Sequence, residues 1–194
     1  LLPHIMHPLV AALPKIEFFL YEKRTAELLA CLDAGSLDML LLPWLDEMNG
    51  FERYDLFEED LLLAVPADSP MAGQSTVSLE SLSGKAVLNL EDGHCLRDQA
   101  LDFCSQAGSK DDERFQATSL ETLRHMVASN MGITLLPKLA TMQPIAADTL
   151  AYIPFSAPVP RREIVLLTRP NYTRVESVEL MAKTIKQVMS DVLA

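Results

Sequence analysis

Apolar residues recur at helical spacing in four parts of the chain. Spacings of three and four residues place such positions on one face of a helix. A capping box of Thr118 and Glu121 marks the start of the third segment, and the fourth predicts a long amphipathic helix. The predicted helices cover residues 5–13, 28–32 (ended by Gly35), 120–127 and 178–192.

Six short apolar runs have the length and composition of strands. In the first run, apolar and polar residues alternate, as in a strand buried on one face. The second and third are continuously apolar and are closed by Pro43 and Pro66, which is typical of parallel strands buried on both faces. The predicted strands cover residues 16–20, 37–42, 61–65, 86–90, 133–136 and 164–167.

The alternation of strands and helices predicts an α/β fold with open parallel sheets and helices on both faces. In this architecture, ligands bind where strands end and helices begin. The strand 86–90 leads through a tight turn into a further helical segment, so we expect chemistry near residues 91–104.

Two cysteines, Cys95 and Cys104, lie nine residues apart in that segment. The residues between them include no Gly or Pro and are mostly helix formers, so a helix is expected. In a helix the two sulfurs would lie on opposite faces and about 13 Å apart along the axis. A disulfide needs Cα atoms within roughly 7 Å. Oxidation that joins the two cysteines would therefore require the helix to unwind.

Cys95 is the better candidate for the reactive thiol. It follows a turn and opens a helix, whose N–H groups and partial positive charge favour a thiolate. His94 and Arg97 add hydrogen-bond donors nearby. Cys104, after Phe103 near the end of the helix, would be a core residue by itself and gains a role only from its partner.

Two other interpretations of the cysteines are a structural role, for Cys31, and a metal site around Cys95. Cys31 lies on an apolar helix face and is expected to be a core residue. A metal site formed by Asp92, His94, Cys95 and Cys104 is conceivable, but the spacing lacks a second close pair of ligands. We therefore predict neither a metal nor any other cofactor.

Composition limits the possible functions. The chain has 194 residues, of which 49% are hydrophobic, enough for a substantial core in one or two domains. Its net charge of −11 argues against nucleic-acid binding by this chain, because phosphates require a basic surface. No apolar run or signal peptide indicates a membrane or secreted protein, and three unevenly spaced cysteines fit a reducing, cytoplasmic location.

Two motifs resemble one family closely. The run EDGHCLRDQA, with a second cysteine nine positions after the first, and the run ATSLETLRHMVASNMGITLLP at 117–137 are similar to the regulatory domains of peroxide-sensing LysR-type transcription regulators. The similarity extends over nearly the whole chain. It includes LLPHI at the start, LDAGSLDMLLLP at 32–43 and the triplet at 160–162. The cysteine motif is the most specific part.

The resemblance implies roles for individual residues. Cys95 corresponds to the peroxidatic cysteine and Cys104 to the resolving one. The residues expected to hold peroxide and stabilise the thiolate are Thr25, His94, Arg97, Asp98 and Arg162. A further pocket threonine of the family would precede Leu1, as would the winged helix-turn-helix. We therefore expect this chain to be the regulatory part of a longer protein.

The resemblance also implies a fold and its division. LysR-type effector domains consist of two Rossmann-like α/β subdomains joined by two crossover strands, as in type 2 periplasmic binding proteins. Here the crossover strands are expected near 57–61 and 162–166. The first subdomain would then comprise residues 1–57 and 166–194, and the second, with the two cysteines, residues 58–165.

The implied function is a hydrogen peroxide sensor, not an enzyme, in which the Cys95–Cys104 disulfide alters DNA binding and transcriptional activation. The implied partners are hydrogen peroxide, a second copy in a homodimer of this domain, and DNA through the missing domain of a full-length tetramer. A glutaredoxin or thioredoxin system would reduce the disulfide. Two alternatives remain, namely a LysR-type domain that binds a small organic inducer and a thiol peroxidase.

Overall fold

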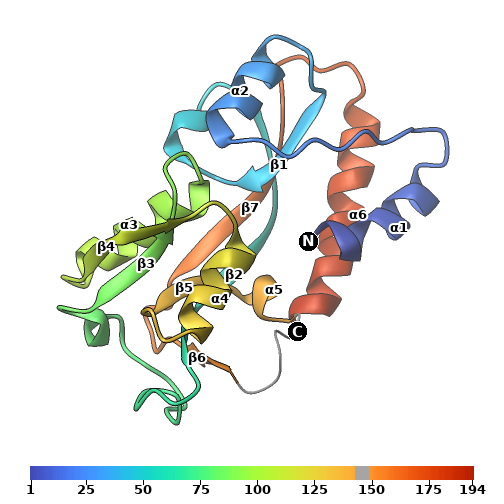
Figure 1. The fold of residues 1–194 in the computed structure, drawn as a ribbon. Helices are drawn as coiled ribbons and strands as arrows, with labels where there is room; N and C mark the ends of the chain where they lie inside the picture. The colour runs from blue at the N-terminus through green and yellow to red at the C-terminus, as the bar shows by residue number, and fades with distance from the viewer. Residues whose placement is uncertain (143–148) are drawn as a thin grey trace. The chain divides into compact units, whose positions relative to one another are not determined.

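The chain forms six α-helices, seven strands and two short 3₁₀ helices in the residues that the structure, a computed structural model, describes, which are 1–142 and 149–194 (Figure 1). The helices are α1 (Leu2–Ala12), α2 (Thr25–Asp33), α3 (Cys95–Gln106), α4 (Leu120–Ala128), α5 (Lys138–Thr141) and α6 (Val175–Leu193), with η1 (Asp46–Met48) and η2 (Leu79–Leu82). The strands are β1 (Met39–Pro43), β2 (Glu52–Pro66), β3 (Ala86–Leu90), β4 (Lys110–Ala117), β5 (Thr134–Pro137), β6 (Leu150–Pro154) and β7 (Arg161–Thr168).

The chain divides into two compact units. The first comprises Leu1–Glu59 and Glu163–Ala194, and the second comprises Asp60–Arg162. Strands β2 and β7 each continue from one unit into the other and are neighbours in the strand order β1-β7-β2-β5. The boundaries lie at 59/60 and 162/163, two or three residues from the positions that the sequence predicted.

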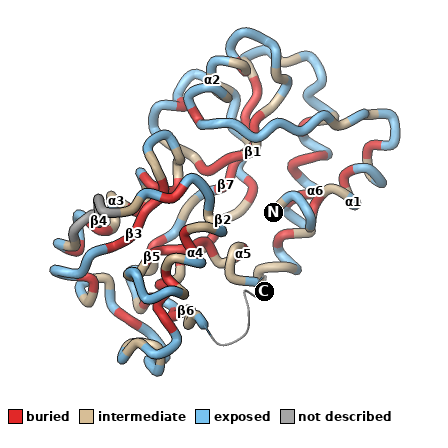
Figure 2. Tube along the Cα trace, viewed as in Figure 1, coloured by how far each residue is buried: buried red, intermediate tan, exposed pale blue. Residues whose placement is uncertain are grey.

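The first unit has two apolar clusters. Helix α1 packs against the long helix α6, and both bury one face, including Ile5 and Leu9 on α1 and Ile185 on α6. Strand β1 pairs antiparallel with β7, and side chains of both strands pack with Leu32 of α2 and Met48 of η1. Buried segments of β1, β7 and α6 appear red in Figure 2.

The second unit contains the larger core. The second half of β2 pairs antiparallel with both β5 and β6, while β3 pairs parallel with β4. Helices α3 and α4 pack against β3 and β4. The core side chains of β2, β3, β5 and both helices form one continuous cluster. This packing holds α3 by one face and leaves the opposite face exposed to solvent.

The predicted α/β fold is confirmed, but the prediction that 37–42 and 61–65 are parallel strands is wrong. Both runs are strands, β1 and part of β2, yet all of their pairings given above are antiparallel. A continuously apolar run indicates that a strand is buried on both faces, but it does not indicate whether the neighbouring strands run parallel or antiparallel to it. Only the β3–β4 pair is parallel among the paired strands described above.

Three further corrections concern single elements. Residues 16–20 form no strand in the described structure, because no neighbouring backbone pairs with them, and Phe19 is 70% exposed. Strands β4 and β6 were not predicted. Strand β4 has a charged sequence, KDDERFQA, in which the Lys, Asp, Glu and Ala residues have low strand propensity, so its pairing with β3 makes it a strand.

The start of α4 also differs from the predicted capping box by one residue. Ser119, not Thr118, is the N-cap, and its hydroxyl oxygen accepts a hydrogen bond from the backbone N–H of Thr122 at 3.2 Å. Glu121 bonds to Arg124 instead of capping the helix. Over the described ranges, no helix has both the length and the apolar character needed to cross a bilayer.

Candidate functional site

The predicted redox segment begins where β3 ends. Gly93 has a φ of 89°, a backbone conformation that glycine adopts without strain, and it turns the chain into α3. His94 is the N-cap residue and has an extended backbone, and Cys95 is the first residue of the helix. Cys95 is partly exposed. The prediction that Cys95 opens a helix directly after a strand and a tight turn is confirmed.

Helix α3 is continuous from Cys95 to Gln106, so it includes both cysteines without a break. Cys104 is 2% exposed and belongs to the buried face with Leu96 and Ala100. Cys95, Cys104 and Cys31 carry no disulfide. Nine helical steps separate the two thiols of α3 by about 13 Å along the axis. The predicted helix between them is therefore confirmed, and the two cysteines cannot bond while it persists.

Arg97 holds the turn before α3 in place. Its side chain is buried, its Nη1 donates a hydrogen bond to the carbonyl oxygen of Leu90 at 3.0 Å, and its Nε lies 2.9 Å from Oδ1 of Asp92. These contacts connect the first turn of α3 to the end of β3. The sequence suggested a donor for the thiolate, whereas the structure shows that Arg97 also positions the helix start.

His94 lies at the same turn but does not cap the helix through its side chain. Its Nε2 is 3.9 Å from Oε1 of Glu91, a distance at which a charged imidazolium would be attracted to the carboxylate. Its backbone carbonyl accepts a hydrogen bond from the N–H of Arg97 at 2.8 Å. His94 is therefore part of the turn that delivers Cys95, with its ring half-buried.

Asp98 occupies the next position along α3. Partial burial raises the pKa of its carboxyl group. Arg97 opposes this change, while the neighbouring carboxylates of Asp102 and Asp92 add to it. The ionised form of Asp98 is thus less favourable in the folded protein than in the unfolded chain.

This raised pKa predicts a pH dependence of stability. The contribution of Asp98 is fully present below its pKa in the unfolded chain and is lost as pH rises through its higher pKa in the folded protein. We therefore expect Asp98→Asn to gain stability relative to wild type as pH rises through that range. Urea unfolding of both proteins as a function of pH measures this difference. A difference that stays constant with pH would contradict it.

Thr25 and Arg162, the other two predicted pocket residues, lie in different units. Thr25 is the first residue of α2, in the first unit, and is 9% exposed. Arg162 lies in β7, at the end of the second unit, and is partly exposed. Thr25 thus lies in a different unit from Cys95, whereas Arg162 lies in the same unit as Cys95. The approach of both side chains to Cys95 stays a prediction.

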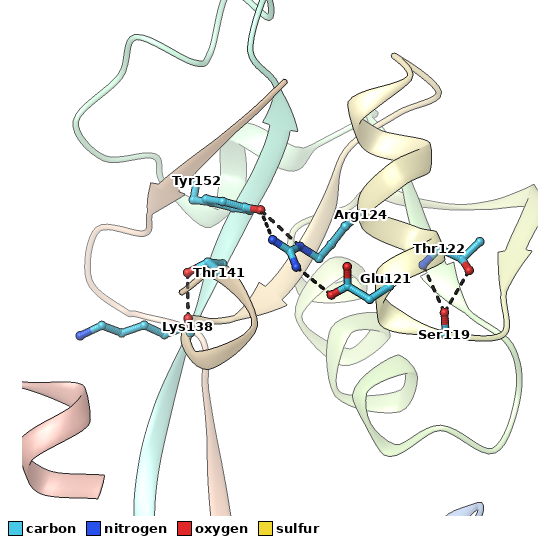
Figure 3. A network of polar contacts seen from close by, with 7 residues as sticks. All are labelled: Ser119, Glu121, Thr122, Arg124, Lys138, Thr141 and Tyr152. Carbon is cyan, nitrogen blue, oxygen red and sulfur yellow. Dashed lines mark hydrogen bonds and ion pairs between the residues drawn. The ribbon is translucent and has the colours of Figure 1, made fainter. Parts of the chain in front are cut away.

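A buried arginine that the sequence analysis did not single out lies on α4. The side chain of Arg124 is only 1% exposed. Its Nη1 donates to Glu121 at 2.7 Å, and its Nη2 and Nε donate to the hydroxyl of Tyr152 on β6 at 2.9 and 3.3 Å (Figure 3). Burial lowers the pKa of this guanidinium, but the hydrogen bonds to Tyr152 and Glu121 outweigh burial and raise it. A sequence signal for this residue existed, because Arg124 stands four residues after Leu120 and three before Val127, on the helix face that is otherwise apolar.

A surface hollow of about 390 Å³ lies in the first unit and includes none of the predicted site residues. It is lined by Asp38 and residues 169–174. Nη1 of Arg169 donates to the carbonyl oxygens of Leu32 and Leu37, and the hydroxyl of Tyr172 donates to Asp38. These bonds connect the segment after β7 to α2 and to the residues just before β1, so we assign the hollow a structural role.

In the described parts of the chain, no three His, Cys, Asp or Glu side chains come together as a metal ion would require. The alternative metal set around Cys95 places one member, Cys104, on the buried face of the same helix. The chemistry that the segment offers is therefore that of two thiols, one partly exposed at a helix start and one buried.

The chain is similar to known proteins over nearly its whole length. Residues 1–190 match the LysR substrate binding domain family. The chain is 46% identical over 189 residues to the DNA-binding transcriptional dual regulator OxyR of Escherichia coli. The aligned region covers 97% of this chain and 62% of that protein. It is 34% identical over 192 residues to a probable hydrogen peroxide-inducible genes activator of Streptomyces viridosporus, over 62% of that protein. The chain thus spans about three fifths of the length of these relatives.

Solved structures agree with the sequence relatives. The structure superposes on oxidised OxyR with a TM-score of 0.88 at 46% identity, over 98% of this chain and 90% of that one. Reduced OxyR gives a TM-score of 0.88 at 43% identity, over 97% and 89%. The reduced OxyR regulatory domain of Pseudomonas aeruginosa gives 0.83 at 32% identity, over 95% and 90%. The predicted resemblance is thereby confirmed, and the chain belongs to the LysR substrate binding domain family.

Proposed function

We propose that this chain is the hydrogen peroxide-sensing regulatory domain of a LysR-type transcription factor. The observation that carries the proposal is the position of the two thiols at opposite ends and faces of one helix, α3. Only one of them, Cys95, is partly exposed and lies at the helix N-terminus, where a thiolate is favoured. The names of two relatives, which are hydrogen peroxide-inducible genes activators, indicate hydrogen peroxide as the oxidant.

The first step is oxidation of Cys95. Its thiolate sulfur attacks one oxygen of hydrogen peroxide, the O–O bond breaks, and the departing hydroxide takes a proton to become water. The product is a sulfenic acid. We assign peroxide binding and thiolate stabilisation to Thr25, His94, Arg97, Asp98 and Arg162. One OxyR relative, a cysteine-to-serine mutant from Corynebacterium glutamicum at 27% identity, has been solved with hydrogen peroxide bound.

The second step joins the two cysteines. The Cys104 sulfur attacks the Cys95 sulfur, the S–O bond breaks, and hydroxide leaves and is protonated to a second water. Because the thiols are about 13 Å apart along α3 and a disulfide needs Cα atoms within roughly 7 Å, the helix must unwind. Withdrawing Leu96, Ala100 and Cys104 from the core costs about 3–5 kcal/mol at the usual values for apolar burial.

The disulfide is expected to be reversible. It closes only a short loop, so it stabilises the oxidised state little by chain entropy. A disulfide that stabilises its oxidised state so little is readily reduced. We propose a glutaredoxin or thioredoxin system as the reductant, which agrees with a cytoplasmic location. We further propose a homodimer of this domain and DNA binding by a separate domain in a full-length tetramer, since the net charge of −11 disfavours DNA binding here.

Titration with hydrogen peroxide tests the proposal. Wild-type protein is expected to lose two hydrogen atoms per chain, to form a Cys95–Cys104 disulfide, and to lose helical circular dichroism. Cys104→Ser is expected to gain one oxygen atom at Cys95 and to keep its helical signal. If one equivalent of peroxide left both thiols unmodified, or if the disulfide formed without loss of helix, the proposal would be wrong. A response to an organic inducer that survives Cys95→Ser would favour the alternative family function.

A further inference from the structure

Helix α3 carries two carboxylates on adjacent turns. Asp98 and Asp102 are four residues apart, so their side chains are neighbours on the helix surface, and both are exposed. Like charges at this spacing destabilise a helix. Burial is the largest cause of the raised pKa of Asp98, and the carboxylate of Asp102 adds to it, in agreement with this repulsion.

Asp102 lies in the C-terminal half of α3, just before the last turn, and no basic residue lies in that turn. The hydroxyl of Ser105 donates to the backbone carbonyl of Asp102 at 2.9 Å, a local bond that weakens helical hydrogen bonding slightly. Repulsion by Asp98 and this local bond are thus two small unfavourable contributions at Asp102.

The stabilising contacts of α3 are concentrated at its other end and on one face. Arg97 bonds the first turn to Leu90 and Asp92, but the N-cap makes no side-chain hydrogen bond. Beyond the first turn, the fully buried positions of the helix are the small residues Ala100 and Cys104. The half of α3 that carries Cys104 is therefore held by burial of these two small residues and by packing of the partly buried Phe103 against the core.

We infer that the Asp98–Asp102 pair sets the threshold for unwinding α3 and thereby controls how readily Cys104 reaches Cys95. In the reduced helix the two carboxylates are held one turn apart, and unwinding separates them. Repulsion thus raises the free energy of the reduced state and favours the oxidised one. This inference rests on the proposed peroxide-sensing function and deepens it, because it concerns the second step alone.

Two other roles for Asp102 predict different results. If its charge acted on the Cys104 thiol, removing that charge would favour the Cys104 thiolate and make disulfide formation faster. If Asp102 were only a solvated surface residue, its removal would change neither step. Under the threshold role, removing the charge stabilises the helix and makes the second step slower. The sign of the change therefore separates the three roles.

The test compares Asp102→Asn and Asp102→Lys with wild type. Lysine adds a favourable pair with Asp98, because the acidic residue precedes the basic one by four positions. Rates of sulfenic acid and disulfide formation are measured separately by acid quenching, thiol alkylation and mass spectrometry. We expect a second step slower by about twofold for Asn and about two- to fivefold for Lys.

Equilibrium and exchange measurements support the kinetic ones. Against a glutathione buffer, the ratio of oxidised to reduced protein should fall by similar factors, and amide protons of α3 should exchange more slowly in the reduced variants. Asp191→Asn is the matched control, because Asp191 is also exposed near the end of a helix without a basic last turn, in α6. It should change neither rate.

Each outcome decides the inference. A second step that is unchanged or faster in both Asp102 variants, while wild type still forms the Cys95–Cys104 disulfide, overturns the threshold role and leaves the proposed function intact. If wild type forms no such disulfide, the proposed function fails and this inference fails with it. An equal effect of Asp191→Asn would show that the change is not specific to α3.

Discussion

Cys95→Ser protein is expected to show no rapid reaction with hydrogen peroxide and no disulfide. A serine hydroxyl is a weak nucleophile toward peroxide, whereas a thiolate at a helix N-terminus is a strong one. The substitution should leave the fold unchanged, because serine differs from cysteine only in an oxygen that replaces the sulfur and Cys95 is only partly buried. Loss of reactivity can therefore be assigned to the missing sulfur.

Peroxide consumption and peptide mass spectrometry measure this result. Cys31→Ser is the control, since Cys31 lies on α2, outside the redox helix. It should react like wild type and form the Cys95–Cys104 disulfide. If Cys95→Ser kept fast peroxide consumption, another thiol would be the reactive one. The double variant Cys31→Ser/Cys95→Ser, in which Cys104 is the remaining cysteine, would then show whether Cys104 reacts with peroxide.

Arg124→Ala is expected to destabilise the second unit by about 2–4 kcal/mol, within the range for removing a buried, hydrogen-bonded charge. The variant would lose the hydrogen bonds to Tyr152 and Glu121, leave the Tyr152 hydroxyl without the guanidinium donors and open a cavity beside α4. The loss of stability should be smaller than for a fully buried ion pair, because the Glu121 carboxylate is 61% exposed and is solvated by water when Arg124 is removed. Figure 3 shows how the guanidinium joins α4 to β6.

Hydrogen exchange followed by mass spectrometry can locate this destabilisation. We expect faster exchange in β5 and β6 of the second unit, and little change in α1 and α6 of the first. Tyr152→Phe should cost about 1 kcal/mol, the usual value of a hydrogen-bond partner, and Glu121→Ala less. Equal losses in the Glu121 and Arg124 variants would show that the ion pair, not burial of the guanidinium, governs stability.

The longer helices and the redox segment could be predicted because they depend on local sequence, whereas the four-residue helix α5 was not predicted. Residue spacing, Gly35 and the helix formers between Cys95 and Cys104 all act within a few residues. The helical segment between the two cysteines is therefore present as predicted, with Cys95 at its start. The cysteine motif also indicated the family, which the comparisons confirm.

Strand pairing could not be predicted in the same way, because it joins residues far apart in sequence. Apolar runs identified β1 and part of β2 but not their antiparallel partners. The charged strand β4 is a strand only because β3 lies beside it, and residues 16–20 have the pattern of a strand without a described partner. Hydrogen bonds between strands depend on the neighbour, which local propensity does not specify.

The sequence by itself determined that two thiols nine residues apart would lie on one helix and could not bond without unwinding it. Only the tertiary structure decided that Cys104 lies on the buried face, that Arg97 connects the helix start to the end of β3, and that Arg124 is buried in the second unit. The physical reason is that helix geometry follows from local backbone preferences, whereas burial and long-range hydrogen bonds arise when distant segments pack together.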